Sequence, residues 1–500
     1  MQKILLFFLL VVIQTIMLAQ PRSIIHLNQN WQYWANPNEN VATALQALEQ
    51  NEVETIDLPH TWNQWDATDI TPGYRRSASW YFKELTIAID PNKRYVLYLE
   101  GANISSAIYV NKQLAGTHIG GYVGFEIDLT DYLQQGATNQ IAIRVDNGYN
   151  PDIIPSQKAD FFIYGGITRD VWLKVLSPEH IQDVQISTPE VSQEKATTTV
   201  QLQLNAPAAG LTAKMELYDP FGQRVAESKE VKVANDQLQV EMPTLKQPQL
   251  WSTAQPNLYE LKVLLKKKGK LVDQTEEKFG YRWFRFDPYG AFYLNGERLK
   301  IRGTHRHEEH AGYGAALPNE LHRRDVEMMK EMGANFVRLA HYPQDPEIYK
   351  ACDELGLIVW DELPWCRGGM GGDNWQKNTM GLLEEQITQN YNHPSILFWS
   401  LGNEIYWLPD FEGGDDEKQL NTFLKKLNDK SHELDPYRMT AIRKYYAGSD
   451  IVDVFSPSIW SGWYAGVYQN YEATIKKNLK LYPRFLHMEY GGSSHVGRHT

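Results

Sequence analysis

The chain has 500 residues, of which 42% are hydrophobic, so it is long enough for two to four domains with packed cores. The formal net charge of −12 and the lack of a Lys/Arg-rich run argue against a nucleic-acid partner, because phosphate binding requires a clustered basic surface. The 15 Trp and 28 Tyr residues suit stacking on sugar rings, but they suit the cores of β-sandwiches equally well.

The N-terminus has the pattern of a targeting segment. Lys3 precedes a continuous apolar stretch over residues 4–13, and the small residue Ala19 follows it. We therefore predict a signal peptide over residues 1–20 that is removed on export. Because the apolar stretch is too short for a membrane span, we expect a mature protein in the periplasm or the medium, without a membrane-bound segment.

The chain contains two cysteines, Cys352 and Cys366. Two are too few for a disulfide framework, and neither directly follows the leader, which excludes a lipid anchor on an N-terminal cysteine. Cys352 falls on a predicted helix and Cys366 in a loop after a strand. We interpret both as buried thiols, with a single bridge as the alternative.

Two consecutive regions have the pattern of antiparallel β-sandwiches. Residues 21–177 contain short segments with alternating apolar and polar residues, such as 95–99 and 140–145, separated by Gly, Asn and Asp turns. Residues 178–287 repeat this pattern over a shorter length and predict a second, smaller sandwich. Asp287-Pro288-Tyr289-Gly290 marks the boundary to the third region.

In the third region, residues 288–500, predicted strands alternate with helical stretches such as 319–332, which indicates βα units and a parallel sheet. The seven candidate strands are 299–303, 336–339, 358–360, 396–400, 439–442, 454–457 and 485–488. An eight-stranded barrel needs one more unit. The seventh strand lies close to Thr500, so we expect a barrel that is incomplete here and a natural chain that continues further.

Two glutamates each close a short apolar run. Glu404 ends Ser400-Leu401-Gly402-Asn403-Glu404, and Glu489 lies in His487-Met488-Glu489-Tyr490-Gly491. The carboxyl ends of buried parallel strands are where α/β barrels carry their reactive groups. The pattern therefore predicts a pair of catalytic carboxylates that flank one glycosidic bond.

Several separated motifs resemble glycoside hydrolase family 2, the family of β-galactosidases, β-glucuronidases and β-mannosidases. The motifs are Leu-Pro-His-Thr-Trp-Asn at 58–63, Tyr-Gly-Gly-Ile-Thr-Arg-Asp-Val at 164–171, Arg-Gly-Thr-His-Arg-His-Glu at 302–308, Asn-Phe-Val-Arg-Leu-Ala-His-Tyr-Pro at 335–343 and the stretch 392–404. Leu339 and Tyr391 depart from the residues usual at their positions, which blurs the subfamily. The resemblance implies a sugar-binding-like jelly-roll sandwich, an immunoglobulin-like sandwich and a (β/α)8 TIM barrel.

By this resemblance Glu404 is the general acid/base and Glu489 the nucleophile of a retaining mechanism. Retention needs carboxyl groups about 5 to 5.5 Å apart, whereas inversion needs about 6.5 to 9.5 Å. We expect a raised pKa for Glu404, because an acid must hold its proton near neutral pH, and an ionised Glu489 held by a neighbouring cation.

Other polar residues at strand ends are candidates for the substrate pocket. Arg338 can orient Glu489, and His307, His341 and Asn403 can bond sugar hydroxyls, although each also suits a structural role. Asp361-Glu362 suits a local ion-pair site at least as well as catalysis.

Residues outside these strand ends are also candidates by the resemblance. Trp460 and Tyr464 follow the sixth strand, where an aromatic side chain could stack on the sugar or donate a hydrogen bond to the nucleophile. Tyr464 is the preferred partner of the nucleophile, against ordinary loop packing. Asp160 matches a position from which the first sandwich reaches into the barrel's pocket.

The sequence predicts that no cofactor is required, and a divalent or alkali cation remains an open alternative. His307-Glu308-Glu309-His310 superficially resembles a zinc motif, but the two histidines are three apart on a loop, not four apart on a helix. No nucleotide-binding glycine fingerprint follows any strand. Some family members bind divalent or alkali cations near the acids, and the sequence does not decide this for the present chain.

The sequence thus predicts an exported, retaining exo-β-glycosidase acting on an oligo- or polysaccharide. The stretch 399–404 is closest to the β-galactosidase branch, so β-galactosidase is the leading activity. β-Glucuronidase is the alternative, because 461–464 resembles that branch's loop, and β-mannosidase is a third. A non-catalytic carbohydrate-binding protein is the competing class. The sequence leaves open whether the protein forms a homo-oligomer.

Overall fold

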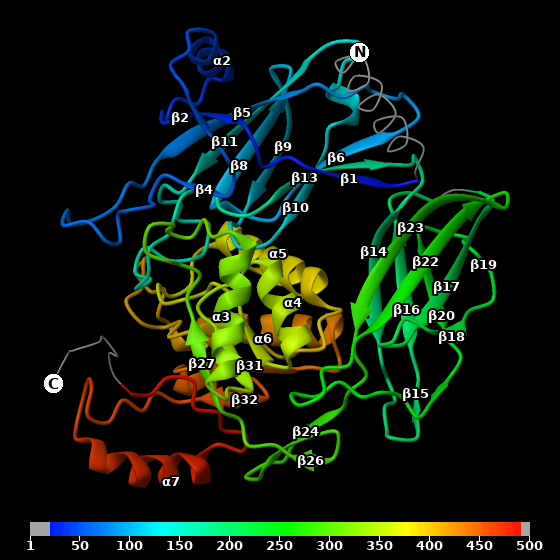
Figure 1. Ribbon diagram of the computed structural model, residues 1–500. Helices are drawn as coiled ribbons and strands as arrows, with labels where there is room; N and C mark the ends of the chain where they lie inside the picture. The colour runs from blue at the N-terminus through cyan, green and yellow to red at the C-terminus, as the bar shows by residue number, and fades with distance from the viewer. Residues whose placement is uncertain (1–20, 208, 492–500) are drawn as a thin grey trace.

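The computed structural model of the chain describes residues 21–207 and 209–491. The predicted signal peptide lies outside the described residues. In Figure 1 the first sandwich lies over one end of the third domain, and the second sandwich lies beside it. None of the helices in the described ranges is long and apolar enough to cross a membrane.

The first domain is an antiparallel sandwich. Its elements are β1 (Ser23–His26), β2 (Trp31–Trp34), α2 (Val41–Glu49), β3 (Glu54–Ile56), β4 (His60–Thr61), β5 (Ala78–Leu85), β6 (Arg94–Leu99), β7 (Ala102–Asn103), β8 (Ser105–Val110), β9 (Gln113–Ile119), β10 (Phe125–Asp128), η1 (Thr130–Tyr132), β11 (Asn139–Asp146), β12 (Gly166–Ile167) and β13 (Val171–Leu176). The main sheets have the orders β1-β13-β6-β10 and β3-β2-β5-β11-β8-β9. Alternate residues such as Leu97, Ile141 and Ile143 point inward and form the core between them.

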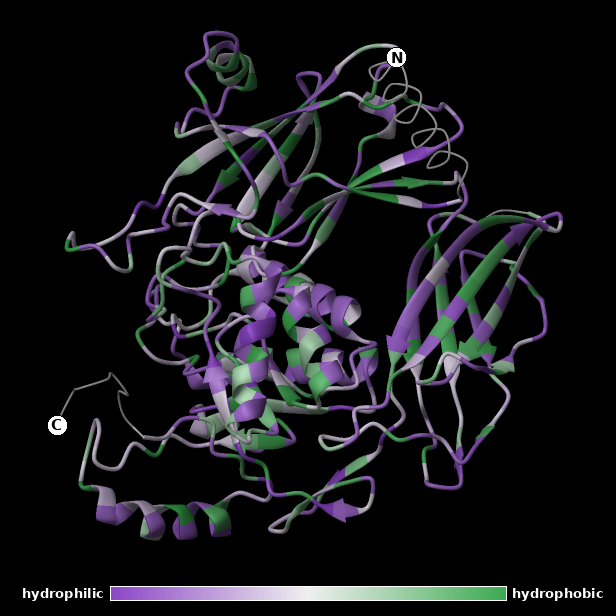
Figure 2. Cartoon of the chain, viewed as in Figure 1, coloured by the Kyte–Doolittle hydropathy of each residue, from purple (hydrophilic) through white to green (hydrophobic). Residues whose placement is uncertain are grey.

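The second domain is a smaller sandwich. Its strands are β14 (Ile181–Ser187), β15 (Lys195–Ala196), β16 (Thr199–Leu204), β17 (Leu211–Tyr218), β18 (Arg224–Glu227), β19 (Val231–Lys232), β20 (Gln237–Glu241), β21 (Leu245–Lys246), β22 (Tyr259–Lys267) and β23 (Lys270–Phe279). Sheet β14-β16-β20 faces sheet β18-β17-β22-β23. Figure 2 shows hydrophobic and hydrophilic residues alternating along these strands, as half-buried strands require.

A short hairpin sheet leads into the third domain, which is a curved parallel sheet covered by helices. The elements are β24 (Phe284–Phe286), β25 (Phe292–Leu294), β26 (Glu297–Arg298), β27 (Gly303–Arg306), α3 (Asn319–Glu331), β28 (Phe336–Leu339), α4 (Pro346–Leu355), β29 (Ile358–Glu362), α5 (Asp373–Asn390), β30 (Ile396–Asn403), α6 (Glu417–Leu434), β31 (Met439–Arg443), η2 (Tyr446–Gly448), β32 (Val454–Ser456), η3 (Tyr468–Asn470) and α7 (Tyr471–Leu481). Strands β27 to β32 pair in chain order, and all pairs are parallel. The predicted fold class is confirmed.

Two predicted strands differ from the structure. The first was expected at 299–303, but pairing with β28 starts only at Gly303, which lies opposite Phe336. Residues 485–488 form no full strand: a single parallel bridge joins Phe485 to Phe455 of β32. The ladder stops there because the Met488 amide donates to the Ser456 side chain and not to a backbone carbonyl.

The first sandwich is anchored on the barrel by a buried ion pair. Arg169 is fully buried, and its Nε donates to Glu308 Oε1 at 3.0 Å while its Nη2 donates to the Pro343 carbonyl at 2.8 Å. The Tyr164 hydroxyl donates to Glu309 Oε2 at 2.6 Å. These contacts position the loop that carries Asp160 over the carboxyl ends of the barrel strands.

Candidate active site

Glu489 is held by two arginines at the inner face of the barrel. Arg338 Nη1 donates to its Oε1 at 2.8 Å, and Arg443 Nη2 lies 2.5 Å from its Oε2. Burial raises the pKa of Glu489, but Arg338 and Arg443 lower it by more, so the pKa falls to about 2. The carboxylate is therefore ionised over the whole physiological pH range, as a nucleophile must be.

Glu404 lies on the other side of Arg443 and is bound by three cations. Its Oε1 accepts from Arg443 Nη1 at 3.1 Å and from Lys444 Nζ at 2.8 Å, and its Oε2 accepts from Arg367 Nε at 2.9 Å. One guanidinium, that of Arg443, thus contacts both Glu404 and Glu489. The structure brings the two sequence-predicted acids together around a single side chain.

The predicted raised pKa of Glu404 is wrong for this structure. Burial raises the pKa of Glu404, but Arg443, Lys444 and Arg367 together lower it by more, and the pKa lies below its usual value. The expectation came from the proton that a general acid must hold, and it did not include the three cations.

The backbone at the strand ends explains how these side chains converge. Arg367, Glu404 and Lys444 each have a positive φ, of 59°, 53° and 52° respectively. Each follows a barrel strand, where the left-handed turn redirects the chain. Non-glycine residues adopt this conformation at a cost and concentrate at functional sites.

Glu362, at the end of β29, binds side chains of the hydrogen-bond network that holds the two acids. It accepts from Arg338 Nη2 at 2.7 Å, and its Oε1 lies 2.8 Å from His341 Nδ1. Burial raises the pKa of Glu362, but Arg338 and the hydrogen bond with His341 lower it well below its usual value. Asp361 instead binds a residue of helix α4: it accepts a hydrogen bond from the Tyr349 hydroxyl at 2.7 Å.

Asn403, at the end of β30, belongs to the same network. Its Oδ1 accepts from Arg443 Nη1 at 2.6 Å and from Arg338 Nη2 at 3.1 Å. Its Nδ2 lies 3.3 Å from Cys366 Sγ. Asn403 therefore links both arginines that hold the acids, and its role toward a sugar hydroxyl stays a prediction.

His307, His341 and Asp160 line the space next to these groups. The ring centroids of His307 and His341 are 5.2 Å apart, and Phe161 lies 5.7 Å from each. Burial lowers the pKa of His307 well below its usual value, so this imidazole is neutral. The Asp160 side chain is 48% exposed and pairs with Arg367, which in turn binds Glu404.

Trp460 contacts the cations that bind the acids, whereas Tyr464 is exposed. The Trp460 ring lies against two cations of the cluster, with Arg443 Cζ at 5.3 Å and Lys444 Nζ at 4.6 Å from its centroid. Tyr464 is 73% exposed and packs edge-on against Trp460 at 5.1 Å. No hydrogen bond joins it to Glu489 among the described residues, and its predicted role remains a prediction.

Sequence analysis missed Arg367, Arg443 and Lys444. A signal for two of them was present, because Arg443-Lys444 directly follow an apolar strand in the same way that Arg338 ends another. Arg367 lies in a loop five residues after β29, and only the folded chain places it beside Glu404.

Cys352 and Cys366 are both free and buried, as interpreted from the sequence. The residues of the His-Glu-Glu-His stretch have structural partners: Glu308 pairs with Arg169 and Glu309 binds Tyr164. These two carboxylates therefore serve the contact between the first sandwich and the barrel.

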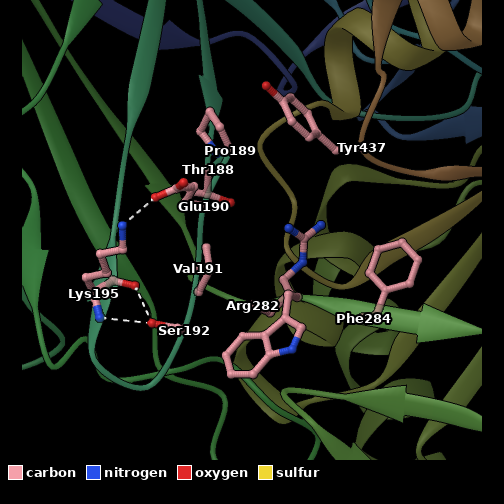
Figure 3. Close-up of a pocket in the computed structure, with 10 residues that line it drawn as sticks. Thr188, Pro189, Glu190, Val191, Ser192, Lys195, Arg282, Phe284 and Tyr437 are labelled. Carbon is pink, nitrogen blue, oxygen red and sulfur yellow. Dashed lines mark hydrogen bonds and ion pairs between the residues drawn. The ribbon is translucent and has the colours of Figure 1, made fainter.

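Two of the cavities in the described part of the chain lie near the barrel. One of about 860 Å³ lies between β27 and residues 485–490, and Arg338, the cation bound to Glu489, lines it. The other, of about 420 Å³, is lined by side chains of the second sandwich, such as Glu190 and Lys195, and by Arg282 and Tyr437 (Figure 3). The second cavity includes none of the residues that bind the two acids.

One carboxylate directly follows barrel strand β30, the other follows the bridged segment 485–488, and two β-sandwiches precede the barrel. This arrangement defines the class of multidomain glycoside hydrolases. Family models of glycosyl hydrolases family 2 match three segments: the sugar binding domain at 24–177, the middle domain at 179–282 and the TIM barrel domain at 288–498. The chain belongs to glycoside hydrolase family 2, so the recognition from sequence is confirmed.

Several relatives carry the names of particular glycosidases. A Formosa agariphila protein provisionally named β-glucuronidase is 57% identical over 95% of this chain, which spans 57% of that protein. A β-glucuronidase of Bacteroides fragilis is 32% identical over 98% of this chain and 71% of its own length. The crystal structure of Parabacteroides merdae β-glucuronidase has a TM-score of 0.90 and 36% identity, over 95% of this chain and 64% of that one. A Thermoanaerobacter pseudethanolicus β-galactosidase is 31% identical over 87% of this chain and 58% of its own length.

Proposed function

We propose that this protein is a retaining exo-β-glycosidase, with Glu489 as the nucleophile and Glu404 as the acid/base. The observation that carries this proposal is the shared contact of both carboxylates with Arg443. Two carboxylates that contact one guanidinium lie near enough to each other to act on the same glycosidic bond. Membership of family 2 supports the same roles.

The cations around Glu404 affect the two steps of the reaction differently. Glu489 attacks the anomeric carbon while Glu404 gives a proton to the departing oxygen, and Glu404 then removes a proton from the incoming water. The cations around Glu404 favour its ionised form, which suits the second step. In the first step the small protonated fraction limits the rate, so we expect a pH optimum on the acidic side.

For the sugar we propose a β-linked glucuronide, in place of the β-galactoside favoured by the sequence motifs. The support is comparative: the relatives at 57% and 32% identity and the structure at a TM-score of 0.90 all carry the name β-glucuronidase. β-Galactoside is the second candidate because of the relative at 31% identity.

Hydrolysis of nitrophenyl β-glucuronide, β-galactoside and β-mannoside, measured side by side with the full chain, tests both parts. We expect the glucuronide to give the highest kcat/KM. Glu489→Gln should abolish turnover while sugar binding stays measurable by calorimetry. Equal turnover in Glu489→Gln would refute the assigned nucleophile, and a higher kcat/KM for the galactoside would refute the sugar.

The cellular location is also a proposal. The segment 1–20 has the charge and apolar pattern of a cleaved leader, so we propose export to the periplasm or the medium. Fractionation of cells that express the full chain, followed by N-terminal sequencing of the product, tests this. A product that retains Met1 in the cytoplasm would contradict it.

A further inference from the structure

Three side chains of different types converge beside the acids. One ligand-type atom from each of Asp160, His341 and Cys366 lies within 4.8 Å of the other two. Cys366 Sγ is 4.0 Å from Asp160 Oδ1. They come from the first sandwich, the end of β28 and the loop after β29, so only the assembled domains bring them together.

We propose that Asp160, His341 and Cys366 form a binding site for a thiophilic divalent cation such as Zn²⁺. Zinc takes Cys sulfur, His nitrogen and carboxylate oxygen, and three protein ligands plus water is the arrangement of its open sites. Bonds of about 2.0 to 2.3 Å place tetrahedral ligand atoms about 3.3 to 3.8 Å apart, so closure around the ion needs shifts of about 1 Å.

Each of the three side chains already has polar partners that fix its orientation. Both Glu362 Oε1, at 2.8 Å, and Arg338 Nη2, at 2.9 Å, lie beside His341 Nδ1, so Nε2 is the ring nitrogen available to an external ligand. Arg367 binds Asp160 Oδ2, which leaves Oδ1 facing Cys366. Outer carboxylates and hydrogen bonds of this kind fix ring orientation and typically account for about 10- to 100-fold in metal affinity.

Cys366 supplies the selectivity for soft ions. Asn403 Nδ2 lies 3.3 Å from its sulfur and orients it. A metal ion binds the thiolate and not the thiol, so binding releases one proton to the solvent as the S–H bond is replaced by a sulfur–metal bond.

The consequence for activity rests on the proposed function. Asp160 and His341 are among the residues expected to contact the sugar, so an ion bound there would occupy the substrate's place. We expect Zn²⁺ to inhibit hydrolysis in competition with the glycoside.

Co²⁺ titration of the full chain tests the site without any activity measurement. A bound thiolate gives a sulfur-to-cobalt charge-transfer band in the near ultraviolet. We expect this band in the unmodified protein and in Cys352→Ser, the matched control on helix α4, and we expect its loss in Cys366→Ser. No band in the unmodified protein, or a band that persists in Cys366→Ser, would overturn the site.

Asp160→Asn is a second variant, because this exposed loop position does not depend on core packing. We expect its Zn²⁺ affinity by calorimetry to fall at least about tenfold, and unchanged affinity would also overturn the site. If no aryl glycoside is hydrolysed, the proposed function fails, while the cobalt band still decides the metal site.

Discussion

Removal of the Lys444 charge should move the pH profile of the reaction upward. Lys444 Nζ donates to Glu404 Oε1 at 2.8 Å, and both side chains are largely buried. A hydrogen bond to a charged group contributes about 1.5 to 3 kcal/mol, and one pKa unit corresponds to about 1.4 kcal/mol. In Lys444→Met the pKa of Glu404 should therefore rise by about 1 to 2 units, while Arg443 and Arg367 remain bound.

The direction of the shift in the pH profile follows from the role of Glu404 as the acid. Glu404 can protonate the leaving oxygen only in its neutral form, so kcat/KM falls as the pH rises above its pKa. A higher pKa moves this basic limb to higher pH. Lys444 Nζ also lies 3.8 Å from the centroid of Trp407 and 4.6 Å from that of Trp460, and methionine replaces the ammonium with an apolar chain of similar length at the same positive-φ position.

The assay is the pH dependence of kcat/KM for a phenyl β-glycoside, whose poor leaving group needs the acid. Lys425→Met is the matched control, because this exposed lysine pairs with Asp429 on α6 and with no other acid among the described residues. We expect a shift of about 1 to 2 pH units in Lys444→Met and none in the control. A basic limb that stays in place, or moves to lower pH, would refute the assignment of Glu404 and of its cation partners.

Two further predictions concern the acid and the contact between domains. Glu404→Gln should lose most of its kcat/KM, by about 10²- to 10⁴-fold, on phenyl glycosides and much less on dinitrophenyl glycosides, whose leaving groups need no proton. Comparison of the two substrates measures this, and equal losses would contradict the acid role. Arg169→Met should destabilise the protein by about 3 to 5 kcal/mol, because it leaves Glu308 buried without its partner. Urea unfolding measures this loss of stability. Lys195→Met, which removes one member of an exposed ion pair, is the control and should have no effect. Equal unfolding midpoints for the two variants would show that the Arg169–Glu308 pair does not anchor the sandwich.

The fold and the two acids were predictable because they depend on local patterns. Unbroken apolar runs such as Ile396-Leu397-Phe398-Trp399 mark strands that are buried on both faces, and all four residues are buried. A residue that directly follows such a strand, as Glu404 follows β30, lies at the carboxyl edge of the sheet whatever the other domains do. The same reasoning found Arg338, and it would have found Arg443.

The charge state of the site was not predictable, since it depends on distances between segments far apart in the chain. Arg367 reaches Glu404 because a loop turns at a positive φ, and Asp160 reaches Arg367 from a different domain across 207 positions. A pKa depends on the sum of burial and every nearby charge. The sequence by itself determined which apolar runs form the barrel strands β28 to β32. Only the tertiary structure decided that three cations surround Glu404, because electrostatic energy depends on separation in space and not along the chain.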